Sequence, residues 1–425
     1  MIKRLVVLML FCSVILSAHG ASAATNTLTL MLYSDGDKKY FAPSIERFER
    51  DHPGVKVDVI MESANYQEKV LTMVATGVAP DVVTGSSDGN FLEWLLDGVV
   101  IDVAPYVERD AAFFKDWIPE YRLRTYYKGR SFGVAHVRAG LYPLWFNRRL
   151  FDAAGVSYPN GEWTWDAFLQ AASKMSIDTN GDGQKDQYGW HHAWKTWVPF
   201  LYNGGGGIQD PNDPGKILLD SQATIEALAF LQDMDFKYGA STPNHNFNGS
   251  RANTAFFNGK AAMIIRSVSL YGGAPEHMKD GQTLGLALAP KAPNGKSHTM
   301  ITIGAFGITK ASKNKELAWE LIKYMVDEES QRYHKVNTGC LTTNHKINQE
   351  YFPSGLPVWN HDKAVLQMVQ LPMFTVDYMM PTSAITIMET MVNAVVNKNE
   401  MSPRMGIEAY MPLIKDAMQD FLAKL

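Results

Sequence analysis

The chain has 425 residues, of which 46% are hydrophobic and 20% are charged, an ordinary composition for a globular protein. Its 40 basic and 44 acidic residues give a net charge of −4, which argues against a protein that binds nucleic acid or anionic membranes. The length exceeds what one hydrophobic core usually holds, so we expect two domains.

Residues 1–24 have the features of a secretory signal peptide. Lys3 and Arg4 give a positive start, an apolar run follows from residue 5 to residue 16, and Ala21-Ser22-Ala23 matches an A-x-A cleavage site. The apolar run is shorter than the roughly 20 residues that a membrane span needs. We therefore expect export to the periplasm, with cleavage near Ala23.

The sequence holds two cysteines, and only one of them follows the predicted signal peptide. Cys12 lies inside the apolar run and lacks the surroundings of a lipid-attachment cysteine, so we expect a protein that is not a lipoprotein. Cys340 would remain alone after cleavage, which excludes an intrachain disulfide. No basic residue adjoins Cys340 in the sequence, so we expect a packed thiol and not a reactive one.

Strands and helices alternate in the first part of the mature chain. We expect a strand over 27–33, a helix over 40–51, a strand over 55–61, a helix over 66–76 that stops at Gly77, and a third strand from Asp81. Alternation with short breaks favours an α/β domain, in which parallel strands are joined by crossover helices.

The middle of the chain continues this pattern. Residues 133–147 form an extended stretch, and a helix is predicted over 148–154, closed by Gly155. Thr164 is a plausible N-cap of the next helix. Later, F-F-N-G-K-A-A-M-I-I (256–265) reads as the end of a helix, a left-handed stop at Gly259 and a strand. That strand points Arg266–Tyr271 beyond the carboxyl edge of the sheet, where open α/β sheets bind ligands.

Several of these segments resemble one known family. Residues 256–263 resemble the F-x-x-G-K-x-A-M signature of the solute-binding proteins of ABC importers, in the maltose-binding-protein-like carbohydrate group. T-G-V-A-P-D-V-V (76–83) and S-K-N-K-E-L-A-W (312–319) resemble further motifs of that group. The resemblance covers nearly all of the mature chain as weak motifs in the right order. It departs at His136, where the family often has proline.

The resemblance implies a two-lobed periplasmic-binding-protein fold, type II-like, in which each lobe is an open β-sheet flanked by helices and a hinge joins the lobes. The implied N-terminal lobe is 25–136 plus 290–338, and the C-terminal lobe is 137–289 plus 339–425. The implied function is capture of a sugar or oligosaccharide for the transmembrane subunits of an ABC permease. A monomer is expected, with no catalytic residue and no required cofactor.

G-S-S-D-G (85–89) leaves a second interpretation open. It fits G-x-S-x-G, with an apolar strand before it and a predicted helix over 91–96 after it, so Ser87 could be the nucleophile of a secreted hydrolase. A hydrolase or lyase that uses a carboxylate pair is a related alternative. In the binding-protein interpretation the same loop faces the ligand. Asp88 falls where the resemblance places a sugar-binding aspartate, and a helix N-cap is its structural alternative.

Aromatic and basic residues complete the predicted site. Aromatic rings stack on the apolar faces of sugars while polar groups take the hydroxyls. Arg138 and Arg266 fall at ends of strands where the family often shows uncharged residues, and an arginine pair could clamp a carboxylate or phosphate. The predicted ligand-binding residues are Tyr33, Asp35, Ser87, Asp88, His136, Arg138, Trp194, Trp197, Arg266, Tyr271, Trp359 and Tyr378.

A loop that starts at Asp178 resembles a calcium site. Oxygen-bearing side chains on alternate residues and Gly183 at the sixth position match the first nine positions of an EF-hand loop, but the twelfth position is Gly189 where a glutamate is needed. A structural Ca²⁺ and an Asp-, Asn- and Gly-rich turn are the two interpretations. The candidate ligands are Asp178, Asn180, Asp182, Gln184 and Asp186.

Overall fold

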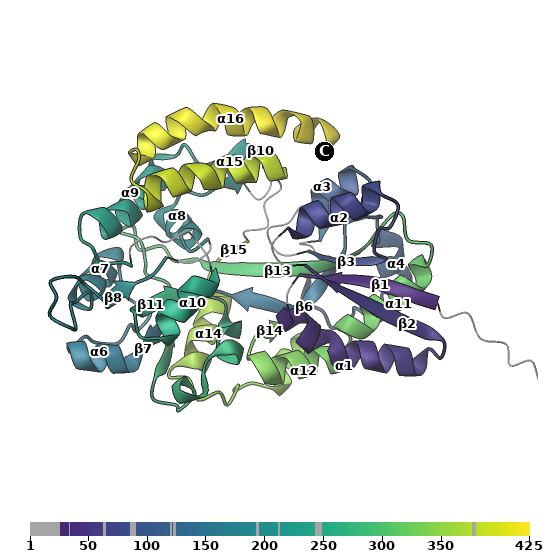
Figure 1. Cartoon of the computed structure of the whole chain (residues 1–425), viewed down its shortest axis with the longest axis horizontal. Coiled ribbons are helices and arrows are strands. Elements are labelled where there is room, and N and C mark those ends of the chain that lie inside the picture. Colours follow the sequence, from purple (N-terminus) through teal and green to yellow (C-terminus); the bar gives the residue numbers. More distant parts are fainter. Residues whose placement is uncertain are drawn as a thin grey trace, which may run out of the picture.

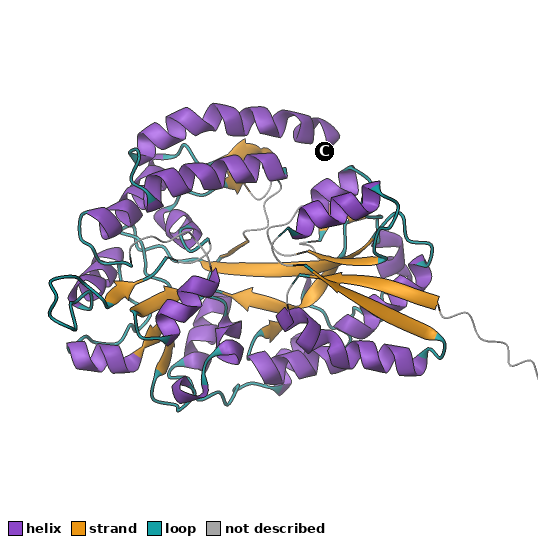
Figure 2. Cartoon of the chain, viewed as in Figure 1, coloured by secondary structure: helices purple, strands orange, loops and turns teal. Residues whose placement is uncertain are grey.

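The computed structural model describes residues 26–33, 35–62, 65–85, 91–119, 121, 125–192, 195–210, 213–242, 249–375 and 380–425. The predicted signal peptide lies outside these ranges. The chain forms two lobes side by side, each built on a sheet with helices packed around it (Figures 1 and 2). Within the described ranges, none of the helices combines the length and the apolar character that crossing a bilayer requires.

The larger sheet belongs to the first lobe and has the order β14-β6-β13-β3-β1-β2, with β15 paired to β13. β1 is parallel to β2 and β3, whereas the long strand β13 is antiparallel to β3 and β6. Its strands are β1 (Asn26–Leu32), β2 (Val55–Met61), β3 (Val82–Gly85), β6 (Val134–Leu141), β13 (Thr299–Ile308), β14 (Leu341–Thr342) and β15 (Met373–Thr375). The helices around it are α1 (Asp35–Asp51), α2 (Tyr66–Ala75), α3 (Phe91–Leu96), α4 (Ala104–Arg109), α11 (Lys315–Val326), α12 (Glu328–Thr338) and α13 (His345–Glu350).

The smaller sheet belongs to the second lobe and has the order β12-β7-β11-β8. Its strands are β7 (Leu144–Asn147), β8 (Tyr188–Trp190), β11 (Ala261–Ile265) and β12 (Leu284–Ala287). Its helices are α6 (Arg148–Ala154), α7 (Trp165–Lys174), α8 (Val198–Gly204), α9 (Gln222–Phe236), α10 (Gly249–Phe257), α14 (His361–Gln370), α15 (Thr382–Val392) and α16 (Pro403–Lys424). Shorter elements are β4 (Tyr126–Tyr127), β5 (Arg130–Ser131), β9 (Gln209–Asp210), β10 (Asp213–Ile217), η1 (Val268–Gly273), η2 (Glu276–Met278) and the π-turn η3 (Asn393–Asn397).

The ends of several helices confirm the predicted stop and start signals. Thr164 accepts a hydrogen bond from the backbone N–H of Ala167 and caps α7. Gly155 ends α6 with φ of 58° and Gly259 follows α10 with φ of 72°, a left-handed conformation that glycine adopts without steric cost. The predicted helix over 40–51 begins earlier, at Asp35. The predicted extended stretch 133–147 is two strands, because the chain leaves the larger sheet after Leu141 and enters the smaller one at Leu144.

One hydrophobic core is shared by the two sheets. It joins Leu30 and Phe306 of the larger sheet with Trp145 and Ile264 of the smaller one. A second core lies mainly in the second lobe but includes Met300 and Phe374 from strands of the larger sheet. A third core surrounds Val83 in the first lobe. The lobes are therefore packed against each other. The lobe boundaries given above remain predictions.

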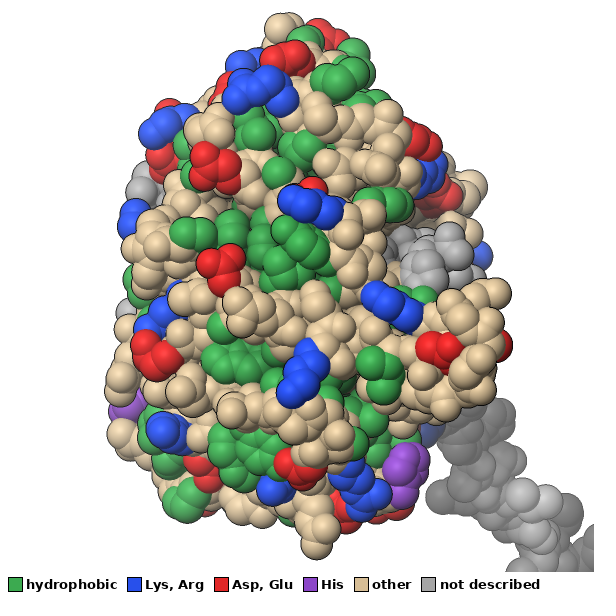
Figure 3. All heavy atoms as spheres, turned by 90° about the vertical axis from the view of Figure 1, so that its left-hand side faces the viewer, with side chains coloured by type: hydrophobic (Ala, Val, Ile, Leu, Met, Phe, Trp, Pro, Cys, Tyr) green, Lys and Arg blue, Asp and Glu red, His purple; other side chains and the backbone are tan. Residues whose placement is uncertain are grey.

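On the visible face of the second lobe (Figure 3), neither acidic nor basic side chains predominate. Figure 3 shows acidic and basic side chains interspersed over the second lobe, with small hydrophobic groups between them. This distribution agrees with the charge balance of the sequence. The face shown in Figure 3 has no basic patch of the kind that binds nucleic acid.

Asp110 ties α4 to α11 in the first lobe. Its carboxylate accepts hydrogen bonds from Arg109 Nε at 3.2 Å and from the indole Nε1 of Trp319 at 2.6 Å, and Lys323 Nζ lies 3.3 Å away. Trp319 is fully buried, as its place in a structural motif predicts. The hydrogen bonds from Arg109 and Trp319, together with Lys323, lower the pKa of Asp110 to about 2.

Asp110→Asn is expected to reduce the free energy of unfolding by about 1–2 kcal/mol at pH 7, after allowance for solvent screening. Because the folded-state pKa lies below the unfolded one, this stabilisation is present above pH 4 and disappears as the pH falls toward 2. Urea unfolding of both proteins between pH 2 and pH 7 measures it. Asp233→Asn is the control, because Asp233 lies on the exposed side of α9 and pairs with the exposed Lys237 at 3.5 Å. A difference that persists unchanged at pH 2 would contradict this account.

Candidate functional site

A cavity of about 350 Å³ lies where the two lobes meet, and we call it the central cavity. Both lobes contribute to it: the first through the ends of β1 and β3, the start of α1 and the middle of β6 and β13, the second through the segment that follows β11. Its lining residues are Tyr33, Asp37, Thr84, Gly85, His136, Gly140, Tyr142, Arg266, Ser267, Ser269, Thr302, Gly304 and Cys340.

The position of the cavity follows from strand direction. β1 and β3 are parallel neighbours, so their carboxyl ends meet at one edge of the sheet, the edge at which open α/β sheets bind ligands. Tyr33 directly follows β1, and Thr84 and Gly85 end β3. In the second lobe, Arg266 directly follows β11. The sequence places polar groups at strand ends, and the fold brings those ends together.

Glycines keep the floor of the cavity open. A Cβ atom at Gly304 would lie 2.7 Å from the backbone oxygen of Gly85, and one at Gly140 would lie 2.5 Å from Oγ1 of Thr302. The distance from Gly304 ends on a backbone atom and is too short for any side chain, so β13 and β3 can approach closely only because this position is glycine. At Gly140 a side chain would have to displace the hydroxyl of Thr302. The backbone and the neighbouring hydroxyls therefore face the cavity directly.

Aromatic rings line the first-lobe side. Tyr33 is 36% exposed and rests edge-on against Tyr66, with ring centroids 5.6 Å apart. His136 is buried except for its cavity side, and its ring stacks on Phe306 at 5.1 Å. Tyr66 is held in place because its hydroxyl donates a hydrogen bond to the backbone oxygen of Met31 at 3.0 Å. Tyr33 is thus the more accessible ring and the one available for stacking.

The second-lobe side is organised around Arg266. Its backbone N–H donates to the carbonyl of Pro143, and Nε1 of Trp145 donates to the carbonyls of Arg266 and Ser267 at 3.2 and 3.3 Å. Its side-chain Nε donates to Oδ1 of Asn253, on α10, at 3.0 Å. Burial lowers the pKa of Arg266, although an arginine remains charged at any physiological pH.

The central cavity brings together Tyr33, His136 and Arg266 from the predicted ligand-binding set. Three other predicted residues lie elsewhere. Trp197 is 2% exposed in the core of the second lobe. Trp359 packs on Phe146 and Tyr158, and Tyr271 is partly buried in η1 beneath the ammonium group of Lys279. None of the three lines the cavity, and each is held by packing within the described structure.

The side chains of the remaining predicted ligand-binding residues lie outside the described part of the structure. Ser87, Asp88, Trp194 and Tyr378 lie outside the described residues, and with them the serine nucleophile of the hydrolase interpretation. Asp35 opens α1 and Arg138 lies in β6, but their side chains are outside the described part. Ligand contact by these residues stays a prediction.

Sequence reasoning missed several lining residues. Ser267 and Ser269 were within the stretch that follows β11 but were not singled out, although their spacing after Arg266 was a usable signal. Thr302 and Gly304 lie inside β13, and no local pattern marks the middle of a strand as part of a site. Cys340 is 1% exposed, which confirms the predicted packed thiol, and it also lines the cavity.

The loop over residues 178–186 is closed by its own hydrogen bonds. The carboxylate of Asp178 accepts from the backbone N–H groups of Asn180, Gly181 and Gly183 at 3.1, 2.6 and 2.7 Å, and these bonds, that from Gly183 first, lower its pKa. Asn180 and Asp182 each accept a further loop N–H. Over the described ranges, no three His, Cys, Asp or Glu side chains converge as a metal site would require. The residues fit a hydrogen-bonded turn, and calcium binding stays a prediction.

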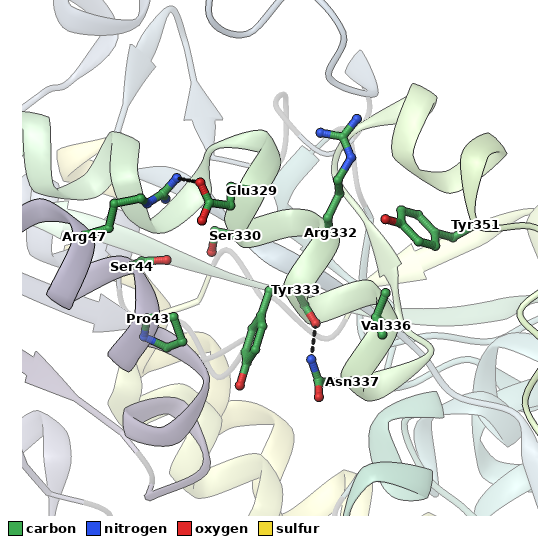
Figure 4. Close-up of a pocket in the computed structure, with 10 residues that line it drawn as sticks. All are labelled: Pro43, Ser44, Arg47, Glu329, Ser330, Arg332, Tyr333, Val336, Asn337 and Tyr351. Carbon is green, nitrogen blue, oxygen red and sulfur yellow. Dashed lines mark hydrogen bonds and ion pairs between the residues drawn. The ribbon is translucent and has the colours of Figure 1, made fainter.

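A second hollow, of about 340 Å³, lies between α1 and α12 (Figure 4). Its two arginines are already paired: Arg47 with Asp327 and Glu329, and Arg332 with Glu328 and Glu350. Its lining comes from α1, α12 and Tyr351, so it does not lie between the lobes. The central cavity is therefore the better candidate for a ligand site.

Comparison with known proteins agrees with this geometry. The family model for bacterial extracellular solute-binding proteins matches residues 34–332. A binding protein of Brucella abortus is 22% identical over 346 residues, which cover 78% of this chain and 79% of that protein. A Thermotoga lettingae solute-binding protein bound to α-D-tagatose has a TM-score of 0.80 at 20% identity, covering 92% of this chain and 100% of that one. The Listeria monocytogenes ABC substrate-binding protein in complex with cycloalternan has a TM-score of 0.79 at 21% identity, covering 92% and 98%.

The chain therefore belongs to the family of bacterial extracellular solute-binding proteins, because the family model matches most of its length. This confirms the resemblance drawn from the motifs around residues 76–83, 256–263 and 312–319. The structural matches confirm the two-lobed α/β fold.

If the loop over 178–186 binds Ca²⁺, addition of Ca²⁺ to chelator-treated protein raises the midpoint of thermal unfolding, because an ion that binds only the folded state stabilises it. Asp178→Ala is then expected to abolish the increase. Asp213→Ala is the control, since exposed Asp213, at the start of β10, also accepts a nearby backbone N–H. Identical midpoints with chelator and with millimolar Ca²⁺ would show that the loop is a turn without a metal.

Proposed function

We propose that this protein is the periplasmic substrate-binding component of an ABC importer and that it captures a sugar or short oligosaccharide between its lobes. The observation that carries the proposal is the central cavity, to which both lobes contribute hydrogen-bonding groups and the first lobe contributes aromatic rings. The tagatose and cycloalternan complexes of the structurally similar proteins support the choice of a saccharide.

The lining suits a polyhydroxylated ligand. Sugar hydroxyls need several donors and acceptors at short range, and Asp37, Thr302, Ser267 and Ser269 supply them from both lobes. The apolar face of a sugar ring needs a flat partner, which Tyr33 supplies. A mixed lining of this kind is typical of small-molecule sites.

The proposed mechanism is capture by closure. β6 leads into β7 through Tyr142 and Pro143, and residues 288–298 join β12 to β13. The first of these connections runs beside the cavity, because Tyr142 lines it. A ligand that contacts Tyr33 in one lobe and Arg266 in the other gains contacts only when the lobes are close. That differential affinity favours the closed state. No bond in the ligand is made or broken.

The same proposal includes the surroundings of the protein. The closed form would dock as a monomer on the transmembrane subunits of a permease, which then admit the ligand to the cell. Export with cleavage near Ala23, without lipid attachment, would place it in the periplasm. The extracellular character of the family supports export.

The mature protein is expected to be stabilised against thermal unfolding by one class in a panel of saccharides, polyols and amino acids. At a ligand concentration a hundred times the Kd, the gain is about 2.7 kcal/mol. Mass spectrometry of the bound ligand after prolonged incubation should recover it unchanged. Stabilisation by amino acids alone would contradict the saccharide assignment, and recovered cleavage products would establish a hydrolase or lyase instead.

Tyr33→Ala is expected to weaken saccharide binding about 3- to 10-fold, the loss of one stacking ring. Titration calorimetry with the ligand found in the panel measures it. Tyr238→Ala is the matched control, because Tyr238 is similarly exposed, at 42%, but lies just beyond the end of α9. Equal affinities of Tyr33→Ala and the wild type would remove Tyr33 from the site.

A further inference from the structure

Arg266 differs from the arginines of the described structure that form ion pairs. Arg47, the least exposed arginine in an ion pair, is neutralised by two carboxylates, and the more exposed Arg109 and Arg332 also have carboxylate partners at 3.0 Å or less. Among the described residues no carboxylate lies within ion-pair distance of Arg266. Its one side-chain hydrogen bond goes to the neutral amide of Asn253.

A charged guanidinium group without a negative partner costs free energy unless a ligand supplies the partner. The side chain of Arg266 is partly buried, and burial lowers its pKa. A charge withdrawn from water without a partner is unfavourable. Arg148 also lacks a carboxylate partner among the described residues, but its Nη1 donates to the carbonyl of Gly281 at 3.0 Å. Arg266 lines the central cavity, where a ligand is the available partner.

The guanidinium group is also held in a fixed orientation. Trp145 and Pro143 fix the backbone of Arg266, and Asn253 takes its Nε. Among the described residues the two terminal nitrogens have no hydrogen-bond partner, and Arg266 lines the cavity. Their planar fork matches the two oxygens of a carboxylate or phosphate, which arginine binds through paired hydrogen bonds.

We propose that the natural ligand carries an oxyanion, a carboxylate or a phosphate ester, which the terminal nitrogens of Arg266 bind while the hydroxyl of Ser267, which accepts from that of Ser269, donates a further hydrogen bond to it. This inference rests on the proposed function, since it names the class of saccharide that the central cavity takes. Asp37, in the first lobe, lines the same cavity and would repel a second anionic group. The site therefore selects a ligand with one charged end and a hydroxylated remainder.

Titration calorimetry of the mature wild-type protein tests the inference without any substitution. The probes are glucuronate and digalacturonate as carboxylates, glucose 6-phosphate as a phosphate ester, and glucose and maltose as neutral counterparts. We expect one class of anionic probe, the carboxylates or the phosphate ester, to bind at least tenfold more tightly than its neutral counterpart. The preference should shrink between 50 and 500 mM KCl, because salt screens the charge interaction. The class of anionic probe that binds shows whether the oxyanion is a carboxylate or a phosphate ester.

Substitutions then assign the preference to Arg266. Arg266→Gln is expected to reduce affinity for the anionic probe at least tenfold, to the level of the neutral probe, and Arg266→Lys to retain part of the preference. Asn253→Ala, which frees Nε, should cause a smaller loss. Arg149→Gln is the control, since Arg149 pairs with Asp280 outside the cavity, and it should bind as the wild type does.

The outcomes separate the two proposals. Neutral probes that bind as tightly as the anionic ones would overturn the inference and leave saccharide capture standing. An anionic preference that survives in a folded Arg266→Gln variant would assign the oxyanion to another residue and also overturn it. Failure of every probe to bind would count against both the inference and the proposed function.

Discussion

The pairing of β6 with β13 is the interaction on which the arrangement of the molecule depends. These two strands lie at the centre of the larger sheet, and each connects to a strand of the smaller sheet. Gly140 of β6 faces Oγ1 of Thr302 on β13, and Gly304 of β13 faces the backbone oxygen of Gly85 on β3. Both glycines line the cavity that the two lobes bound. The two strands therefore link the sheets and carry part of the site between them.

The chemistry of that site follows from what the lobes supply to it. The first lobe contributes an accessible ring, Tyr33, and a carboxylate, Asp37, while the second contributes a charged guanidinium group and two serine hydroxyls. Neither set would enclose a ligand alone. The hydrophobic core shared by the two sheets holds the lobes against each other. In the proposed mechanism their relative motion opens and closes the cavity, as in hinge-type binding proteins.

The local part of this structure could be predicted from the sequence and the long-range part could not. The helix over 148–154 was predicted with its correct bounds, because Asn147 and Gly155 cap it within a few residues. The division of 133–147 between two sheets was missed, since an extended run carries no mark of which strand it will pair with. For the site, the rule that ligands lie beyond strand ends led to Tyr33 and Arg266. Tryptophans such as Trp197 and Trp359 were harder to place, because a ring in the core and a ring in a cleft have the same local sequence signal.

The central claim is that a ligand in the central cavity draws the lobes together. Small-angle X-ray scattering of the mature protein, with and without a saturating saccharide, tests it most directly. The account predicts a smaller radius of gyration with the ligand, and no such change in a variant that cannot bind it. An unchanged radius with the ligand demonstrably bound would contradict capture by closure.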